Sequence, residues 1–109
     1  MANMFKLKTK ANVGVTTVGI YTAPAATTTV VIGITLSNTS GSGVNVGVGI
    51  TRAGTTEDVK LLKNAPIPQG SSLEFMAGNK VVLETTDTVT VDSDTNNSVD
   101  AALTIMEIT

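Results

Sequence analysis

The chain has 109 residues, of which 41% are hydrophobic, 15% charged and 3% aromatic, and its formal charge at pH 7 is -2. This length fits a single domain, and the mild acidity argues against a nucleic-acid-binding protein, which would carry a basic surface. The chain has no Cys and no His, which excludes disulfide frameworks, the common zinc sites and catalytic pairs that need an imidazole or a thiol.

The remaining composition favours β-strands. Thr, Val and Ile together make up 40 of the 109 residues, and such β-branched side chains pack well on a pleated sheet. No window approaches the roughly 18 consecutive apolar residues of a membrane-spanning helix, and the first residues lack the apolar stretch of a secretory signal. We therefore expect one all-β domain with no membrane segment.

The N-terminal residues stand apart from the rest of the chain. We predict that residues 1–12 form an extended arm and that residues 13–109 form the β-sandwich domain. The alternative is a first strand in which Phe5 and Leu7 are partly buried. Within residues 13–20 the apolar alternation slips by one position, which predicts a bulge or a bend between two sheets.

Two consecutive segments alternate between apolar and small or polar residues, as half-buried strands do. In residues 29–37 the apolar row is Val30, Ile32, Ile34 and Leu36. In residues 44–51 the apolar row is Val44, Val46, Val48 and Ile50. Residues 38–43 between them are all turn formers. We therefore predict a hairpin with a long loop, whose two apolar rows face the core.

The second half of the chain contains shorter segments. Residues 59–62 are predicted as a short strand or a turn of helix. Pro66, Pro68 and Gly70 are predicted to interrupt the regular structure with a loop. Further strands are expected at residues 73–75, 80–84, 88–92 and 98–108, with turns at 77–79 and 85–87. The last strand is apolar on both faces, which suggests that both are covered. Together the segments predict an all-β fold: a single jelly-roll-like β-sandwich of about seven or eight antiparallel strands.

One string has the pattern of a metal site. In residues 92–100 acidic and amide side chains alternate, as at the start of an EF-hand calcium loop. The sixth position is Asn97 where that loop needs Gly, and the twelfth is Leu103 rather than a bidentate Glu. A polar loop with Asx turns explains the string as well. We therefore predict no metal site and no cofactor.

Carboxylate pairs are the remaining candidates for catalysis. They occur at Glu57 with Asp58 and at Glu84 with Asp87. Glycoside hydrolysis uses such pairs in a cleft that aromatic side chains wall, and this chain has only one Tyr and two Phe. The pairs are more simply turn and strand-end residues, so we predict that the chain is not an enzyme and has no catalytic residues.

Glycines and lysines indicate a surface for self-association. Glycine weakens a strand and often marks close approach by another backbone, here either a neighbouring subunit or the chain's own N-terminal segment. Residues 1–56 carry a net charge of +4 and residues 57–109 a net charge of -6, so opposite charges are available for contacts between copies. The predicted interface residues are Lys6, Lys8, Lys10, Gly33, Gly47 and Gly49.

Several segments carry a resemblance to a known family. They are YTAPAATTTVVIG at 21–33, KNAPIPQGSSL at 63–73, KVVLETTDTV at 80–89 and the ending at 101–108. These segments resemble small virion structural proteins of tailed bacteriophages, especially of phages that infect cyanobacteria and other marine bacteria. In those relatives a Gly often precedes the Asp of the turn at 85–87, where this chain has Thr86.

The resemblance implies a β-sandwich component repeated many times in the virion. We expect a capsid decoration (cement) protein that is made in the host cytoplasm and binds the major capsid protein. It would be a homo-oligomer, with a trimer favoured, and its N-terminal arm would reach a neighbouring subunit. The alternative is a tail, collar or baseplate accessory protein. A glycan-binding adhesion module, with calcium in residues 92–100, is the third possibility.

Overall fold

The computed structural model describes residues 3–75 and 80–109. These residues form nine strands and no helix, which confirms the all-β prediction with one or two more strands than expected. The strands are β1 (Asn3–Val13), β2 (Val18–Thr22), β3 (Thr28–Asn38), β4 (Val44–Arg52), β5 (Glu57–Ile67), β6 (Ser72–Phe75), β7 (Val81–Leu83), β8 (Asp87–Ser93) and β9 (Val99–Ile108). In this described part of the chain there is accordingly no helix long and apolar enough to cross a membrane.

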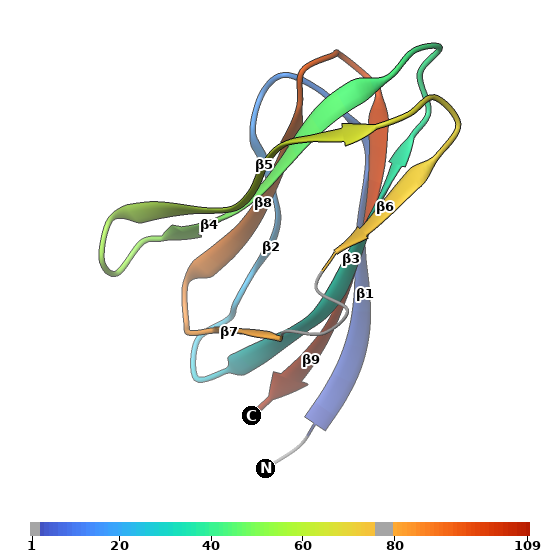
Figure 1. Cartoon of the computed structure of the whole chain (residues 1–109). Coiled ribbons are helices and arrows are strands. Elements are labelled where there is room, and N and C mark those ends of the chain that lie inside the picture. Colours follow the sequence, from blue (N-terminus) through green and yellow to red (C-terminus); the bar gives the residue numbers. More distant parts are fainter. Residues whose placement is uncertain (1–2, 76–79) are drawn as a thin grey trace.

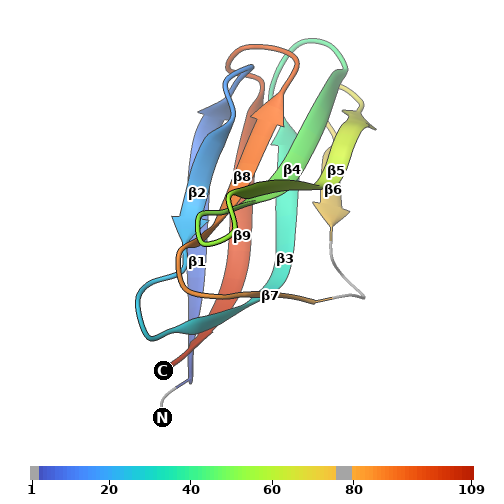
Figure 2. The same ribbon diagram turned by 90° about the vertical axis from the view of Figure 1, so that its left-hand side faces the viewer.

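The strands form two antiparallel sheets that pack face to face (Figures 1 and 2). Sheet A has the order β1-β9-β3-β6, and β7 pairs with β3 on the same side as β6. Sheet B has the order β2-β8-β4-β5. The chain passes repeatedly from one sheet to the other in the pattern of two Greek keys. The fold is therefore a jelly-roll β-sandwich, as predicted.

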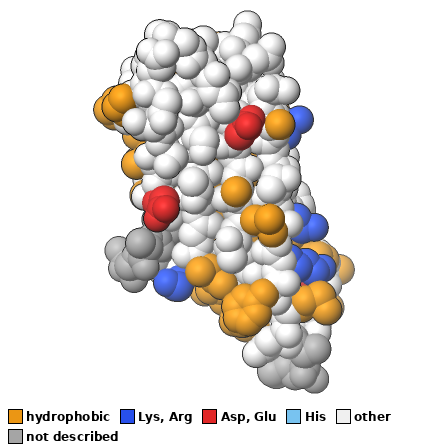
Figure 3. All heavy atoms as spheres, turned by 90° about the vertical axis from the view of Figure 1, so that its right-hand side faces the viewer, with side chains coloured by type: hydrophobic (Ala, Val, Ile, Leu, Met, Phe, Trp, Pro, Cys, Tyr) orange, Lys and Arg blue, Asp and Glu red, His pale blue; other side chains and the backbone are white. Residues whose placement is uncertain are grey.

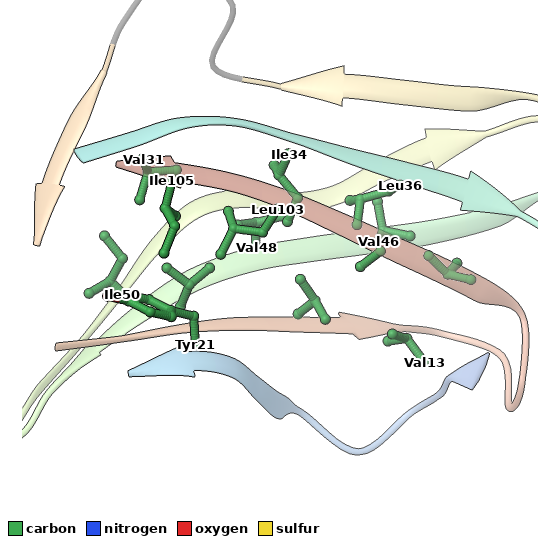
Figure 4. Close-up of a cluster of buried hydrophobic side chains, with 14 of the residues drawn as sticks. Val13, Tyr21, Val31, Ile34, Leu36, Val46, Val48, Ile50, Leu103 and Ile105 are labelled. Atoms are coloured by element: carbon green, nitrogen blue, oxygen red, sulfur yellow. The ribbon is translucent and has the colours of Figure 1, made fainter. Parts of the chain in front are cut away.

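The core lies between the sheets and comes from the inward-facing rows of the strands. On β9 the residues Leu103 and Ile105 are fully buried, and in Figure 4 they lie close to Val48 of β4. Burying each such side chain contributes about 1.5–3 kcal/mol. The predicted inward rows of β4 and β9 are confirmed. The outer row of β9 is exposed or half-buried, so the described part of the chain does not itself cover this second face.

A β-bulge in β3 reverses part of its predicted inward row. Between Val31 and Gly33 the pairing advances two residues on β3 but one on β9, so Ile32 is an extra residue. One extra residue reverses the alternation of side chains between the two faces of a strand. The inward residues are therefore Val31, Ile34 and Leu36. The prediction that Val30 and Ile32 also face the core is wrong.

The predicted hairpin between β3 and β4 is also wrong, because the two strands lie in different sheets. The buried side chain of Asn38 holds the crossing loop. Its Nδ2 donates to the carbonyls of Ser42 (2.8 Å) and Ile67 (2.9 Å), and its Oδ1 accepts from the Ser40 N–H (2.9 Å). The side-chain amide thus satisfies loop groups that hairpin pairing would otherwise satisfy.

Five other connections also join different sheets, and two of them test predictions made from the sequence. The segment between β1 and β2 crosses from sheet A to sheet B, which confirms the bend predicted within residues 13–20. The turn at 85–87 joins β7 of sheet A to β8 of sheet B and does not close a hairpin. The turn predicted at 77–79 lies outside the described residues.

β5 includes the predicted segment 59–62, which is a strand, and it continues through Pro66. A proline is tolerated there because β5 is the outermost strand of sheet B, so one of its edges needs no ladder bonds. The predicted interruption is a turn at Pro68 and Gly70, and the expectation that Pro66 also interrupts the strand is wrong. The Ser71 N–H donates to the Pro68 carbonyl (3.1 Å), and Gly70 has a φ of 73°.

The N-terminal segment forms β1, which pairs with β9 from Asn3 opposite Ile108 to Lys10 opposite Ala101. It is thus an edge strand of sheet A in this structure. Phe5 and Leu7 are 69% and 65% exposed, not partly buried. Contact between this segment and a neighbouring subunit stays a prediction.

The turn between β7 and β8 holds Thr86 in the left-handed region, at a φ of 74°. The turn is fixed on both sides: Asp87 N–H donates to the Glu84 carbonyl (3.0 Å), and Thr86 N–H donates to the Ala23 carbonyl (2.9 Å). A β-branched residue at this φ costs roughly 1–2 kcal/mol. The surrounding hydrogen bonds impose this conformation on a residue that disfavours it.

Replacing Thr86 by Gly should therefore stabilise the protein. We expect Thr86→Gly to raise the free energy of unfolding by about 0.5–1 kcal/mol, since relief of strain exceeds the entropy cost of Gly. Thr85→Gly is the matched control, because Thr85 does not have a positive φ, and it should lower stability slightly. Urea denaturation followed by circular dichroism gives both values. Equal losses in the two variants would contradict the assignment of strain to Thr86.

Candidate functional site

A row of apolar side chains crosses the outer face of sheet A. Phe5 of β1 is opposite Met106 of β9, Met106 is opposite Val30 of β3, and Val30 is opposite Val82 of β7. Residues that are directly opposite in a sheet have their side chains on the same face. Phe5 is 69% and Val82 57% exposed. These four residues form a continuous line, which we call the apolar row.

Neighbouring residues widen this row into a patch. Leu7 is 65% exposed, and Ile32 and Ile108 are half-buried on the same face. Figure 3 shows that apolar side chains gather on the lower half of this face. We call the apolar row together with Leu7, Ile32 and Ile108 the outer patch. Large contiguous apolar patches are uncommon on monomeric soluble proteins and mark interaction surfaces.

The bulge in β3 is the structural cause of this patch. With unbroken alternation, Val30 and Ile32 would share a face with Ile34 and point into the core. Because Ile32 is the extra residue, both side chains lie on the outer face, beside Met106. The signal for the patch in the sequence is the second apolar row of the last strand, which the sequence analysis interpreted as covered.

The lysines of β1 alternate with Phe5 and Leu7 and lie on the opposite side of the strand. Lys6, Lys8 and Lys10 are opposite inward-facing residues of β9, but β1 is an edge strand, so they are half-buried or exposed. Lysines directed inward from an edge strand oppose pairing with a further strand. Their role in contacts between copies stays a prediction.

One lysine belongs to a buried polar cluster at the end of the sandwich where β9 ends. Lys6 Nζ lies 2.8 Å from Glu107 Oε1. The hydroxyl of Tyr21 donates to Glu107 Oε2 (2.6 Å) and also hydrogen-bonds with Thr29 Oγ1 (2.8 Å). Thr29 is fully buried and Glu107 is 8% exposed. The cluster therefore joins both sheets through side chains of β1, β2, β3 and β9.

These contacts change the proton affinities of the cluster. The hydrogen bond from Lys6 and the one from Tyr21 lower the pKa of Glu107 below its usual value. Burial and the nearby Glu107 carboxylate raise the pKa of Tyr21 to about 12. This cluster was not predicted from the sequence. The signal was Glu107 itself, a charged residue at the next inward position of β9 after Ile105.

The ionisation of Tyr21 can be measured directly, since it is the only Tyr in the chain and there is no Trp. We expect absorbance near 295 nm to report ionisation near pH 12 in the folded protein, compared with about 10 for the unfolded chain. Because the folded pKa is the higher one, stability should fall as pH rises from 10 to 12. Ionisation near pH 10 in a still-folded protein would contradict the buried hydrogen bonds of Tyr21.

A second ionic cluster joins β4 to the turn between β7 and β8. Arg52 Nε lies 3.1 Å from Asp87 Oδ1, and Arg52 Nη2 pairs with Glu84 Oε1. Asp87 is 4% exposed, and its Oδ2 also accepts the Glu84 N–H (2.9 Å). Both carboxylates are thus used to hold a turn in place. The geometry agrees with the structural interpretation of this pair in the sequence.

The three glycines do not share one surface, because Gly33 is in sheet A while Gly47 and Gly49 are in sheet B. A Cβ added to Gly49 would lie 2.8 Å from the carbonyl oxygen of Val59, and one added to Gly47 would lie 2.6 Å from Asp92 Oδ1. Close approach therefore does occur at both, but it comes from this chain's own β5 and β8. Gly33 lines a hollow on the outer face of sheet A.

The acidic loop residues of 92–100 are held apart by separate hydrogen bonds. Asp92 Oδ2 accepts from Thr17, Asp94 Oδ1 from the Asn45 N–H, and Asp100 Oδ1 from the Asn12 N–H. Within residues 3–75 and 80–109, no three His, Cys, Asp or Glu side chains are grouped closely enough to hold a metal ion. These carboxylates connect strand ends and loops of the sandwich.

Comparison with known proteins gives matches at the level of structure alone. No protein-family model matches the chain, and no curated protein sequence matches it. A chain from the Bacillus endospore appendages, described as a novel family of disulfide-linked pili, matches with a TM-score of 0.57 and 16% identity, over 99% of this chain and 87% of that chain. The present chain has no Cys.

Two viral structures are also similar. A chain from the acid-stable capsid structure of Helicobacter pylori bacteriophage KHP30 matches with a TM-score of 0.59 and 11% identity, over 98% of this chain and 87% of that chain. A chain of infectious bursal disease virus strain Gx matches with a TM-score of 0.53 and 11% identity, over 95% of this chain but 32% of that chain. At these identities the likeness establishes a shared fold.

Proposed function

We propose that this protein is a structural subunit of a bacteriophage virion, most specifically a capsid decoration protein that stabilises the head shell. The observation that carries the proposal is the jelly-roll fold itself, whose likeness to a phage capsid chain extends over nearly the whole of both chains. The segments at 21–33, 63–73 and 80–89 add their resemblance to phage virion proteins.

The chemistry of the surface supports a structural role rather than an enzymatic one. The carboxylates at Glu84, Asp87 and Glu107 are engaged with Arg52 or Lys6 and hold the fold together. Three of the six exposed large hydrophobic side chains of the described residues, Phe5, Leu7 and Val82, lie in the outer patch, and such a patch is suited to binding protein surfaces. A decoration protein acts by adding contact area between subunits of the shell, and the outer patch offers such area.

The proposed partner is the major capsid protein, with the chain present as a homo-oligomer, most simply a trimer at a junction of capsid subunits. Lys8 and Lys10 of β1 form no ion pair within the described residues, and they and the exposed end of that strand are available for contacts with neighbouring copies. The protein would be made in the host cytoplasm and be found in the completed virion.

Immunogold electron microscopy tests this proposal. Antibodies raised against the purified chain are applied to virions of the phage that encodes it. Dense label over the head is the expected result. Label confined to the tail or neck would replace the decoration role by a tail, collar or baseplate role. Virions without label, in preparations where a known head protein is labelled, would overturn the proposal of a virion protein.

A further inference from the structure

The charges around the outer patch restrict the kind of surface that can cover it. Lys8 and Lys10 lie on the free edge of β1, with their side chains on the opposite side of the strand from Phe5 and Leu7, and Lys80 precedes β7 at the other margin. Figure 3 shows Lys or Arg side chains at both margins of the apolar region. In the described part of the chain, none of these three lysines forms an ion pair.

The carboxylates closest to the apolar row are already neutralised. Glu107 pairs with Lys6, and Glu84 pairs with Arg52. The other acidic residues on this face are Glu74, opposite Thr35, and Asp100, opposite Ser37. At roughly 3.3 Å per residue, these positions lie roughly 16 Å and 23 Å along β3 from Val30. Lysines therefore border both ends of the apolar row, while Glu74 lines a hollow on this face together with Lys80 and Ile32 of the patch.

A second copy is a poor occupant of this face. Twofold contacts bring the same surface of both copies together. Because lysines lie at both margins, a twofold arrangement centred on the apolar row places lysines opposite lysines at the ends of that row. A surface with an apolar centre and carboxylates around it would instead match both the row and its rim.

We propose that the outer patch is the docking surface for a partner protein whose contact region has an apolar centre and a carboxylate rim. The inference rests on the proposed role in a virion, whose shell supplies this partner. Phe5 and Val82 anchor the contact, as exposed large side chains at the two ends of the apolar row. Lys8 and Lys80 pair with the partner's carboxylates and fix the orientation of the complex.

Binding to particles that lack this chain tests the proposal. Purified chain is mixed with such particles and co-sedimented over a series of concentrations and salt levels. The wild-type chain should bind, and its affinity should fall as ionic strength rises. Phe5→Glu and Val82→Glu each place a carboxylate in the apolar row and should weaken binding about ten-fold or more. Lys80→Glu should also weaken binding and reduce its salt dependence.

Val15→Glu is the matched control, because Val15 is 56% exposed and lies outside the patch. It should leave the affinity within about two-fold of wild type. Circular dichroism checks that every variant is folded, and two independent row variants guard against a folding defect in one of them.

Four other results would each overturn a different part of the proposal. Wild-type binding that neither row variant weakens would overturn the patch and leave the virion role intact. Binding that is independent of salt and of Lys80 would overturn the carboxylate rim. A wild-type dimer in light scattering that Phe5→Glu converts to monomer would assign the patch to a second copy. Failure of the wild-type chain to bind particles would overturn the virion role and the partner together.

Discussion

Replacing Glu107 by Ala should lower the free energy of unfolding by about 2–3 kcal/mol, measured by urea denaturation followed by circular dichroism. The carboxylate is 8% exposed and is bonded to both Lys6 and Tyr21. Its removal leaves an ammonium group and a buried hydroxyl without their common acceptor. It also removes the side-chain link between β1 and the cluster, which Lys6 provides, although β1 keeps its backbone pairing with β9.

Glu74→Ala is the matched control, since Glu74 is an exposed Glu of the same sheet, and its effect should stay within about 0.5 kcal/mol. Glu107→Gln keeps the size of the side chain but removes the charge. A Glu107→Ala variant as stable as the control would show that the cluster contributes nothing to the fold.

The same cluster should make the free energy of unfolding depend on pH in the acidic range. The folded pKa of Glu107 lies below the ordinary value of 4.5, chiefly because of the hydrogen bond from Lys6. Its stabilisation is therefore complete above the unfolded pKa and is lost as pH falls through the folded pKa. The difference in stability between wild type and Glu107→Gln should be constant above about pH 6 and shrink below about pH 4.

The inward rows of the strands could be predicted from the sequence wherever alternation is unbroken. β4 is such a strand: Val46 and Val48 alternate with small or polar residues and form the core as predicted. On β9 the residues Leu103 and Ile105 also form the core as predicted, although Met106 and Ile108 make its other face apolar too. The inward side of such a strand can be predicted because one face lies entirely against the core and the other lies entirely towards solvent. Composition predicts the class of fold for a related reason, since β-branched residues suit a pleated sheet.

Sheet membership could not be read from the same pattern. An alternating row shows which side of a strand is buried but not which sheet the strand joins. β3 and β4 look like a hairpin because turn formers separate two matching rows. The deciding interaction is the bond from Asn38 to the carbonyl of Ile67, a residue 29 positions away, and local propensity carries no information about it.

The candidate surface was predictable only in part. The sequence identified β1 and its lysines as unusual, but the outer patch depends on the bulge at Ile32, and a bulge leaves no clear mark on an apolar segment. Val30, Val31 and Ile32 are all apolar, so the sequence is compatible with either row of β3 facing the core. The pairing with β9 fixes the phase, and this pairing brings Phe5, Met106, Val30 and Val82 into one row.

Replacing Gly49 by Ala should lower the free energy of unfolding by about 2–3 kcal/mol, although the change adds a single methyl group. The added Cβ would lie 2.8 Å from the Val59 carbonyl oxygen and 3.2 Å from Thr90 Oγ1. A carbonyl oxygen cannot rotate away as a side chain does. Relief requires β5 to move from β4, where the register already shifts on both sides of Val48. Thermal and urea denaturation measure the loss.

Gly33→Ala is the matched control, since its added Cβ would meet only the Phe75 carbonyl oxygen at an ordinary 3.5 Å, and it should change stability by less than about 0.5 kcal/mol. The pair separates two reasons for a glycine in a strand. Where the chain's own backbone requires it, as at Gly49, the isolated protein loses stability. Where a partner requires it, the isolated protein is unaffected and particle binding weakens instead. Gly33 lies beside the outer patch, so Gly33→Ala belongs in the particle-binding series as well. Equal stability losses at Gly49 and Gly33 would contradict the close packing of β5 against β4.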